Sequence, residues 1–175
     1  MKNYMFYLAV VLFVFTSCEK ESLEPEMLNA NFQVESSQKA HIKKVQGFKA
    51  HLTGGQEVPI PVETNATGQT TFKLSKDYSS LQFKLIVANI ENVAAAHIHI
   101  GEQGSNGPVA VTLYMGLKEG RSSGVLAEGM ITDEMVTGYT LAELIDIMLE
   151  GGAYVNVHTS QNPGGEIRGQ ISANN

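Results

Sequence analysis

Three histidines occupy two alternating segments of the chain, and their spacing allows them to share one face of a sheet. His97 and His99 lie in the segment AHIHIG, and His158 lies in the later segment YVNVHTSQNPGGEIRGQI. Side chains two residues apart in a strand point to the same face, so His97 and His99 are expected to lie together. Asn156 is expected to share a face with His158 for the same reason. If the two segments pair, the three imidazoles meet.

Two interpretations fit these residues. Neutral imidazole binds copper and zinc, and a site with three protein ligands leaves one position open for chemistry. Asn156, Glu166 and Arg168 would then orient the rings of a metal site on His97, His99 and His158. Alternatively, the rings form a polar seam without metal, hydrogen-bonded to backbone carbonyls or to Asn156 and Glu166, because buried polar groups need partners. The residues leave both interpretations open, and no catalytic residue is assigned.

Residues 1–17 predict the signal peptide of a lipoprotein. Lys2 precedes an apolar run over 5–15, and two small residues precede Cys18, the only cysteine. This pattern is typical of bacterial lipoprotein processing, so Cys18 is the expected site of lipidation. The alternative is an ordinary secretory signal that leaves Cys18 as a free thiol. We expect an exported protein, anchored by acyl chains in the cell envelope and most readily in the outer membrane.

The charge balance excludes one class of partner. The 175 residues include 18 acidic and 12 basic side chains, for a net charge of −6. Nucleic-acid binding depends on phosphate neutralisation by Lys and Arg, so no nucleic acid is expected. Residues 18–43 are polar and rich in glutamate, which predicts a flexible tether. With a single cysteine, the domain expected over 44–175 has no internal disulfide.

Short alternating segments between Gly, Pro and Asn clusters predict an all-β domain, a Greek-key-like sandwich or flattened barrel of about eight strands. One short helix is expected over 141–150, because Thr140 and Glu143 form a capping box and Gly151 suits the C-terminal end. The expected strands are 47–52, 68–75, 80–88, 94–100, 109–113, 124–131, 153–158 and 166–171.

Three blocks of the chain resemble the CHRD domain, the module named after chordin and found in bacterial exported proteins. They are FKAHLTGGQEVPIPVETNATGQTTF, AAAHIHIGEQGSNGPVAVTLY and YVNVHTSQNPGGEIRGQI, in the expected order. The resemblance spans residues 48–171. It implies a β-sandwich, and the biochemical activity of the family in bacteria is mostly unassigned.

The HIH triplet, the later VNVH and Arg168 also look like the strand pattern of copper/zinc superoxide dismutases. In that family an arginine near the C-terminus guides the anionic substrate, and Arg168 has a similar place in the chain. The departures are substantial, because residues 104–120 contain no His or Asp for a zinc loop and a disulfide is impossible. This likeness supports a related sandwich more than it supports dismutase activity.

The sequence therefore gives two functional hypotheses. The first is a membrane-anchored, non-enzymatic CHRD lipoprotein that acts in binding or in envelope structure, with an unknown protein or envelope partner. The second is a copper or zinc metalloprotein with superoxide-dismutase-like or other redox chemistry.

Overall fold

Alternating buried and exposed side chains build the first two strands of this protein. In β1 (Gly47–Thr53) and β2 (Thr67–Leu74), most neighbouring residues differ in burial, as a half-buried strand requires. The structure is a computed structural model that describes residues 45 and 47–174, which belong to one compact unit. The predicted signal peptide, Cys18 and the tether lie outside the described residues. Within the described part, no helix is both long and apolar enough to cross a bilayer.

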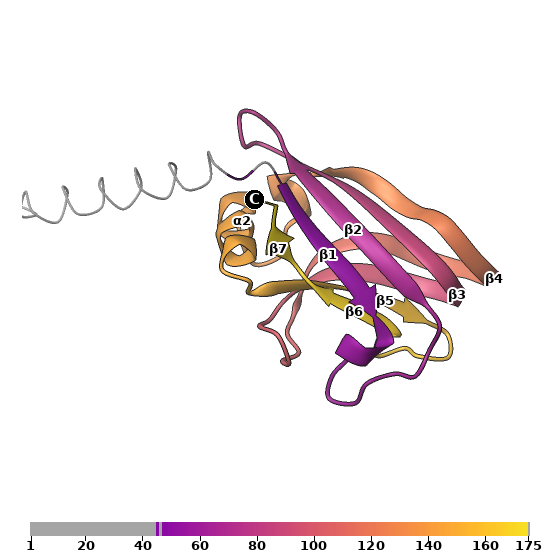
Figure 1. Cartoon of the computed structure of the whole chain (residues 1–175). Helices are drawn as coiled ribbons and strands as arrows, with labels where there is room; N and C mark the ends of the chain where they lie inside the picture. Colours follow the sequence, from indigo (N-terminus) through magenta and orange to yellow (C-terminus); the bar gives the residue numbers. More distant parts are fainter. Residues whose placement is uncertain (1–44, 46, 175) are drawn as a thin grey trace, which may run out of the picture. The chain divides into compact units, whose positions relative to one another are not determined.

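Two long strands run side by side in the sheet (Figure 1). β3 (Leu81–Ile100) pairs with β4 (Val109–Ile131) along one edge. Its other edge pairs first with β2 and then with β5 (Ala153–Thr159). β5 pairs with β6 (Ile167–Gln170), and β6 meets β1, which also pairs with β7 (Ser172–Ala173). All pairs are antiparallel, and the path β2-β1-β6-β5-β3 closes because β3 returns to β2. The predicted all-β sandwich or flattened barrel is confirmed.

Two predicted strand pairs are single strands in the structure. The segments 80–88 and 94–100 lie in β3, and 109–113 and 124–131 lie in β4. Asn89 and Asn92 have φ of 58° and 51°, and the pairing with β4 shifts register around them. Asparagine tolerates this left-handed conformation, so the chain forms bulges where the sequence favours turns. The two-residue strand β7 was not predicted, because it is too short to show a period.

The helix predicted over 141–150 is confirmed as α2 (Leu141–Leu149). Thr140 caps it, and the reciprocal hydrogen bonds with Glu143 complete the capping box. Gly151 follows with φ of 76°, as expected of the residue after the helix. The apolar stripe of the helix joins the hydrophobic core, to which the fully buried Phe48, Leu85, Ile98 and Val155 also belong.

The strand β5 is buried on both faces. Val155 and Val157 point into the hydrophobic core. Tyr154 and Asn156, which point to the opposite face, are also buried. A second, polar layer therefore lies outside this part of the sheet. Loops from 54–66, 101–108 and 160–166 meet over it, as hydrogen bonds between these loops and the layer show.

Closure of the sheet at β6 requires a residue without a side chain at position 169. A Cβ at Gly169 would lie 2.4 Å from the carbonyl oxygen of His51 on β1. We expect Gly169→Ala to lower the free energy of unfolding by about 1–3 kcal/mol, because the strands must separate to admit a methyl group. Urea denaturation measures this.

The matched control is Gly164→Ala. Gly164 is exposed, and a Cβ there meets nothing within 4 Å. Its free energy of unfolding should stay within about 0.5 kcal/mol of the native value. Equal stability of the two variants would contradict the close approach of β1 and β6.

Candidate metal centre

The register between β3 and β5 places the three histidines on the outer, polar face of the sheet. His97 lies opposite Asn156, and His99 lies opposite Tyr154. His158 follows Asn156 by two residues and therefore shares its face. Pairing of the two segments thus brings together the side chains that the sequence placed on two separate strands.

The three rings are in contact. His97 Nδ1 lies 3.1 Å from His158 Nε2. The ring centroids of His97 and His99 are 5.6 Å apart, and those of His99 and His158 are 6.1 Å apart. One nitrogen from each ring can be chosen so that all three lie within 4.8 Å of one another. Among the described residues, this is the one group of three or more metal-ligating side chains with such spacing.

Backbone carbonyls set the tautomers of two rings. His99 Nδ1 lies 2.9 Å from the carbonyl oxygen of Gly107, and His158 Nδ1 lies 2.9 Å from that of Pro163. A carbonyl oxygen only accepts, so each Nδ1 carries the proton and each Nε2 keeps its lone pair. His158 Nε2 then accepts a hydrogen bond from His97 Nδ1. His99 Nε2 is buried and has no hydrogen-bond partner.

All three imidazoles are held neutral near pH 7. Burial, together with the neighbouring rings of His158 and His99, lowers the pKa of His97 to about 4. Burial also lowers the pKa of His99 and of His158, although the hydrogen bonds to the two carbonyls oppose this shift. Neutral imidazole is the metal-binding form, so an ion would face little competition from protons.

A stack of planar groups supports one side of the cluster. The rings of His99 and Tyr154 are parallel to within 6°, with centroids 4.9 Å apart. The Arg168 guanidinium carbon lies 3.5 Å from the centroid of the Tyr154 ring. Since β5 lies between β3 and β6, His99 and Arg168 flank Tyr154 from opposite sides. The stack fixes the plane of the His99 ring.

Arg168 organises a loop and does not face solvent. It is 2% exposed. Its guanidinium donates to Asn106 Oδ1 and to the carbonyl oxygens of Glu102 and Ser105, at 3.1, 3.2 and 2.7 Å. These bonds hold the loop that supplies the Gly107 carbonyl to His99. A guiding role for an anionic substrate, which the dismutase resemblance implies, needs an accessible guanidinium, and this geometry does not provide one.

Glu166 also serves the loops. Its carboxylate oxygens accept hydrogen bonds from four side chains: Thr64, Thr159, Gln161 and Asn162. It therefore holds the 160–166 loop, whose Pro163 carbonyl orients His158. The sequence suggested that Glu166 and Arg168 orient rings directly. In the structure they act through backbone carbonyls that no sequence motif identifies.

Glu57 is a further member of the polar layer. Its side chain is 5% exposed, and its Oε1 has no hydrogen-bond partner. Burial raises the pKa of Glu57 from 4.5 to about 7, while the charge of Arg168 opposes the shift. The signal in the sequence was the carboxylate in GGQEVP, next to two glycines and a proline, but its burial depends on contacts across the fold.

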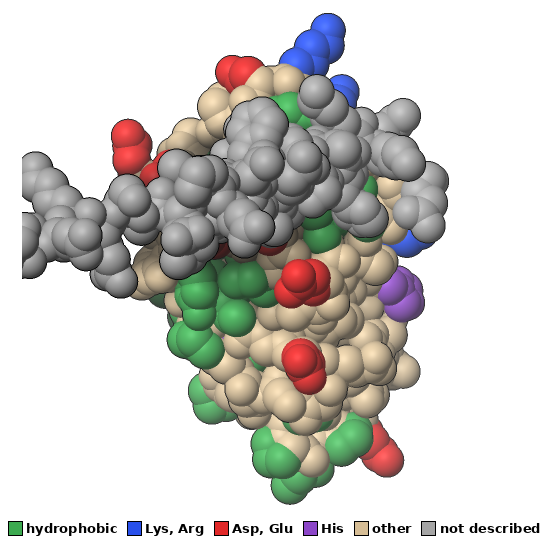
Figure 2. All heavy atoms as spheres, turned by 90° about the vertical axis from the view of Figure 1, so that its left-hand side faces the viewer, with side chains coloured by type: hydrophobic (Ala, Val, Ile, Leu, Met, Phe, Trp, Pro, Cys, Tyr) green, Lys and Arg blue, Asp and Glu red, His purple; other side chains and the backbone are tan. Residues whose placement is uncertain are grey.

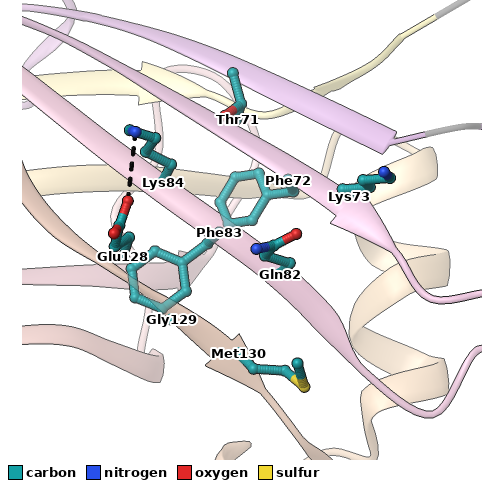
Figure 3. A pocket seen from close by; sticks show the side chains of 9 residues that line it. All are labelled: Thr71, Phe72, Lys73, Gln82, Phe83, Lys84, Glu128, Gly129 and Met130. Carbon is teal, nitrogen blue, oxygen red and sulfur yellow. Dashed lines mark ion pairs between the residues drawn. The ribbon is translucent and has the colours of Figure 1, made fainter.

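Other surface features lie apart from this cluster. A hollow of about 600 Å³ lies over β2, β3 and β4, where Phe72 and Phe83 stand near the exposed ion pair of Lys84 and Glu128 (Figure 3). It brings no metal-ligating or nucleophilic set together. On the face shown in Figure 2, acidic side chains stand apart from one another and hydrophobic ones form small groups. The polar layer is where the described residues concentrate potential chemistry.

A known protein family matches most of the described residues. The CHRD domain family matches residues 48–171. The chain is 31% identical over 125 residues to Chordin of Xenopus laevis, a match that covers 67% of this chain and 12% of that protein. The chain therefore spans a small part of the length of this relative. No solved structure matches the chain.

The buried carboxyl predicts a pH dependence of stability. Because the pKa of Glu57 is raised from 4.5 to about 7, the folded state binds this proton more tightly than the unfolded state. The stability that Glu57 contributes is full below about pH 4.5 and falls as the pH rises to about 7. We expect the stability difference between the native protein and Glu57→Gln to fall by roughly 1–3 kcal/mol over this range.

Urea denaturation of both proteins at several pH values measures this difference. The three histidines have lowered pKa values, so their own contribution rises with pH. It is present in both proteins and cancels in the comparison. A difference that stays constant between pH 4.5 and 8 would show that Glu57 is solvated.

Proposed function

We propose that this chain, which belongs to the CHRD domain family, is a binding module that holds one divalent transition-metal ion, copper or zinc, on His97, His99 and His158. The role is non-enzymatic. The ion either contributes to the binding of a partner or stabilises the folded structure of the module. The proposal joins the two hypotheses that the sequence left open.

One observation carries the proposal. Two backbone carbonyls hold the protons of His99 and His158 on Nδ1, which leaves both Nε2 lone pairs inside one cluster. Metal-ligating histidines commonly donate their other ring nitrogen to a carbonyl in this way. A polar seam would need donors for these lone pairs, yet His99 Nε2 has none. The arrangement supports ligation better than a seam.

Copper and zinc suit this donor set. Imidazole nitrogen is a good ligand for both ions, and the described cluster contains no thiolate or carboxylate. An ion bound to His97 Nδ1 and His158 Nε2 would take the place of the hydrogen bond between them, and the His97 proton would move to Nε2 of its own ring, because a neutral imidazole keeps one ring proton. Superoxide chemistry gains no support from Arg168, because its guanidinium is buried and committed to the loop.

Metal binding can be measured on the full-length protein in detergent. We expect about one zinc or copper ion per chain after removal of loose metal. His99→Ala should weaken binding by at least about tenfold, because it removes the nitrogen that lacks any other partner. Elemental analysis and competition with a chelator report the stoichiometry and the affinity.

The matched control is His51→Ala. His51 is exposed on β1 and is not part of the cluster. It should bind the ion as the native protein does, and circular dichroism should show the same fold in all variants. A metal content at background level in the native protein would contradict the proposed metal binding.

The location of the module is part of the proposal. The apolar run, the small residues and Cys18 support export and lipidation at Cys18, with the domain presented on a tether from the outer membrane or another envelope surface. The envelope partner is an unidentified protein or an envelope component.

Replacement of the lipidated residue tests this location. We expect Cys18→Ser to move the protein from the membrane fraction to the soluble fraction and to abolish labelling with a radioactive fatty acid, because no second cysteine is present to carry acyl chains. The same chain with His51→Ala should stay in the membrane fraction. Retention of Cys18→Ser in membranes would point to another anchor.

A further inference from the structure

The polar layer contains an unusual concentration of acceptors that lack donors. Across the described residues, six buried side-chain polar atoms have no hydrogen-bond partner. Four of them belong to this layer: Glu57 Oε1, His99 Nε2, Asn156 Oδ1 and Gln170 Oε1. With the His99 proton on Nδ1 and the Glu57 carboxyl ionised, all four atoms are acceptors. Buried acceptors without donors destabilise a fold, so a cluster of them favours a bound cation.

Asn156 is placed to complete the histidine cluster. It lies directly opposite His97 in the ladder, diagonal to His99, and two residues before His158 on the same face. It therefore neighbours all three rings. The histidines alone supply three ligands, and a tetrahedral ion takes four.

Asn156 Oδ1 and His99 Nε2 are two atoms of the polar face that lack a donor. The Asn156 side chain lies diagonal to His99 across the ladder of β3 and β5. Nδ1 of that ring is engaged with Gly107, which leaves the lone pair on Nε2. Asn156 Oδ1 and His99 Nε2 are both buried and both lack a donor. A metal ion between them would satisfy both lone pairs.

Glu57 favours this orientation of the amide. A Cβ at Gly165 would lie 2.5 Å from Glu57 Oε1 and 2.8 Å from Asn156 Nδ2, so both atoms crowd the same bare position. Glu57 Oε1 makes no hydrogen bond, so its attraction for the amide nitrogen is electrostatic and favours the orientation with Nδ2 toward Glu57. Arg168 supplies a positive charge that stabilises the ionised form of Glu57. The amide oxygen is left on the side of the rings.

We infer that Asn156 Oδ1 is the fourth protein ligand of the ion held by His97, His99 and His158, and that Glu57 is the positioning residue that keeps this oxygen turned toward the ion. The inference rests on the proposed metal-binding function. Three nitrogens and one oxygen from the protein leave no open position, and closed sites of this kind hold structure, whereas catalytic sites keep a place for water or substrate. The module would bind the ion without activating a substrate on it.

Cobalt(II) is the probe for the number of ligands, because its visible absorption is much stronger in four-coordinate than in six-coordinate sites. We expect the full-length protein in detergent to show the strong four-coordinate spectrum. Asn156→Leu should lose that intensity as water molecules enter, and its zinc affinity should fall by about tenfold or more. Asn156→Asp should restore both, since a carboxylate oxygen replaces the amide oxygen.

Thr70→Val is the matched control. Thr70 Oγ1 is another buried atom without a hydrogen-bond partner, but it lies on β2 and is not part of the histidine cluster. It should leave the cobalt spectrum and the zinc affinity unchanged. Glu57→Gln should weaken zinc binding when Asn156 is present. It should have no further effect on zinc binding in a protein that already carries Asn156→Leu. A purely structural role of Glu57 would instead weaken binding in both proteins.

These results distinguish failure of the fourth ligand, Asn156, from failure of the proposed metal binding. A native protein that binds no metal overturns both. A native protein that loses metal with His99→Ala, while Asn156→Leu keeps the native affinity and spectrum, overturns the fourth ligand alone. Independent effects of Glu57→Gln and Asn156→Leu, each adding to the other, overturn the positioning role of Glu57.

Discussion

The pairing of β5 with the second half of β3 is the constraint on which the candidate site depends. It joins residues about sixty positions apart in the chain, and its register alone decides that His97 meets Asn156 and that His99 meets Tyr154. A shift of β5 by one residue would turn its Tyr154, Asn156 and His158 into the hydrophobic core and Val155 and Val157 out of it. The apolar face of β5 therefore locks the polar face in place, because the core tolerates no other register.

The polar layer is stabilised by groups that never touch the candidate ion. Arg168 stacks on Tyr154 and donates to the 101–108 loop, while Glu166 accepts four hydrogen bonds from the loops beside it. Each loop in turn presents one carbonyl oxygen to one histidine. A charged side chain buried in this way needs satisfied partners, and the loops supply them. The same bonds that remove the cost of burying these charges thus fix the histidine tautomers.

Sequence patterns predicted the elements better than the contacts between them. Strand alternation gave the all-β fold, and Thr140 with Glu143 gave α2, because both signals are local. The predicted strands 80–88 and 94–100 form one strand because bulges at the left-handed Asn89 and Asn92 interrupt the alternation without ending the pairing. The shared face of His97 and His99 follows from period two alone. The carbonyls of Gly107 and Pro163 and the burial of Glu57 depend on loops that meet only in the folded chain, so no spacing in the sequence reveals them.

Buried acceptors without donors connect the stability of the module to its occupancy. His99 Nε2 and Asn156 Oδ1 are both buried without a hydrogen-bond partner, and the fold carries that cost. An ion that binds only the folded state would stabilise the fold, by an amount that grows with the logarithm of its concentration. The fold can carry the cost because the hydrophobic core beneath β5 is continuous. A preorganised ion site requires a rigid support and free lone pairs. The hydrophobic core under β5 provides the support, and the polar face of the same strand contributes the lone pairs.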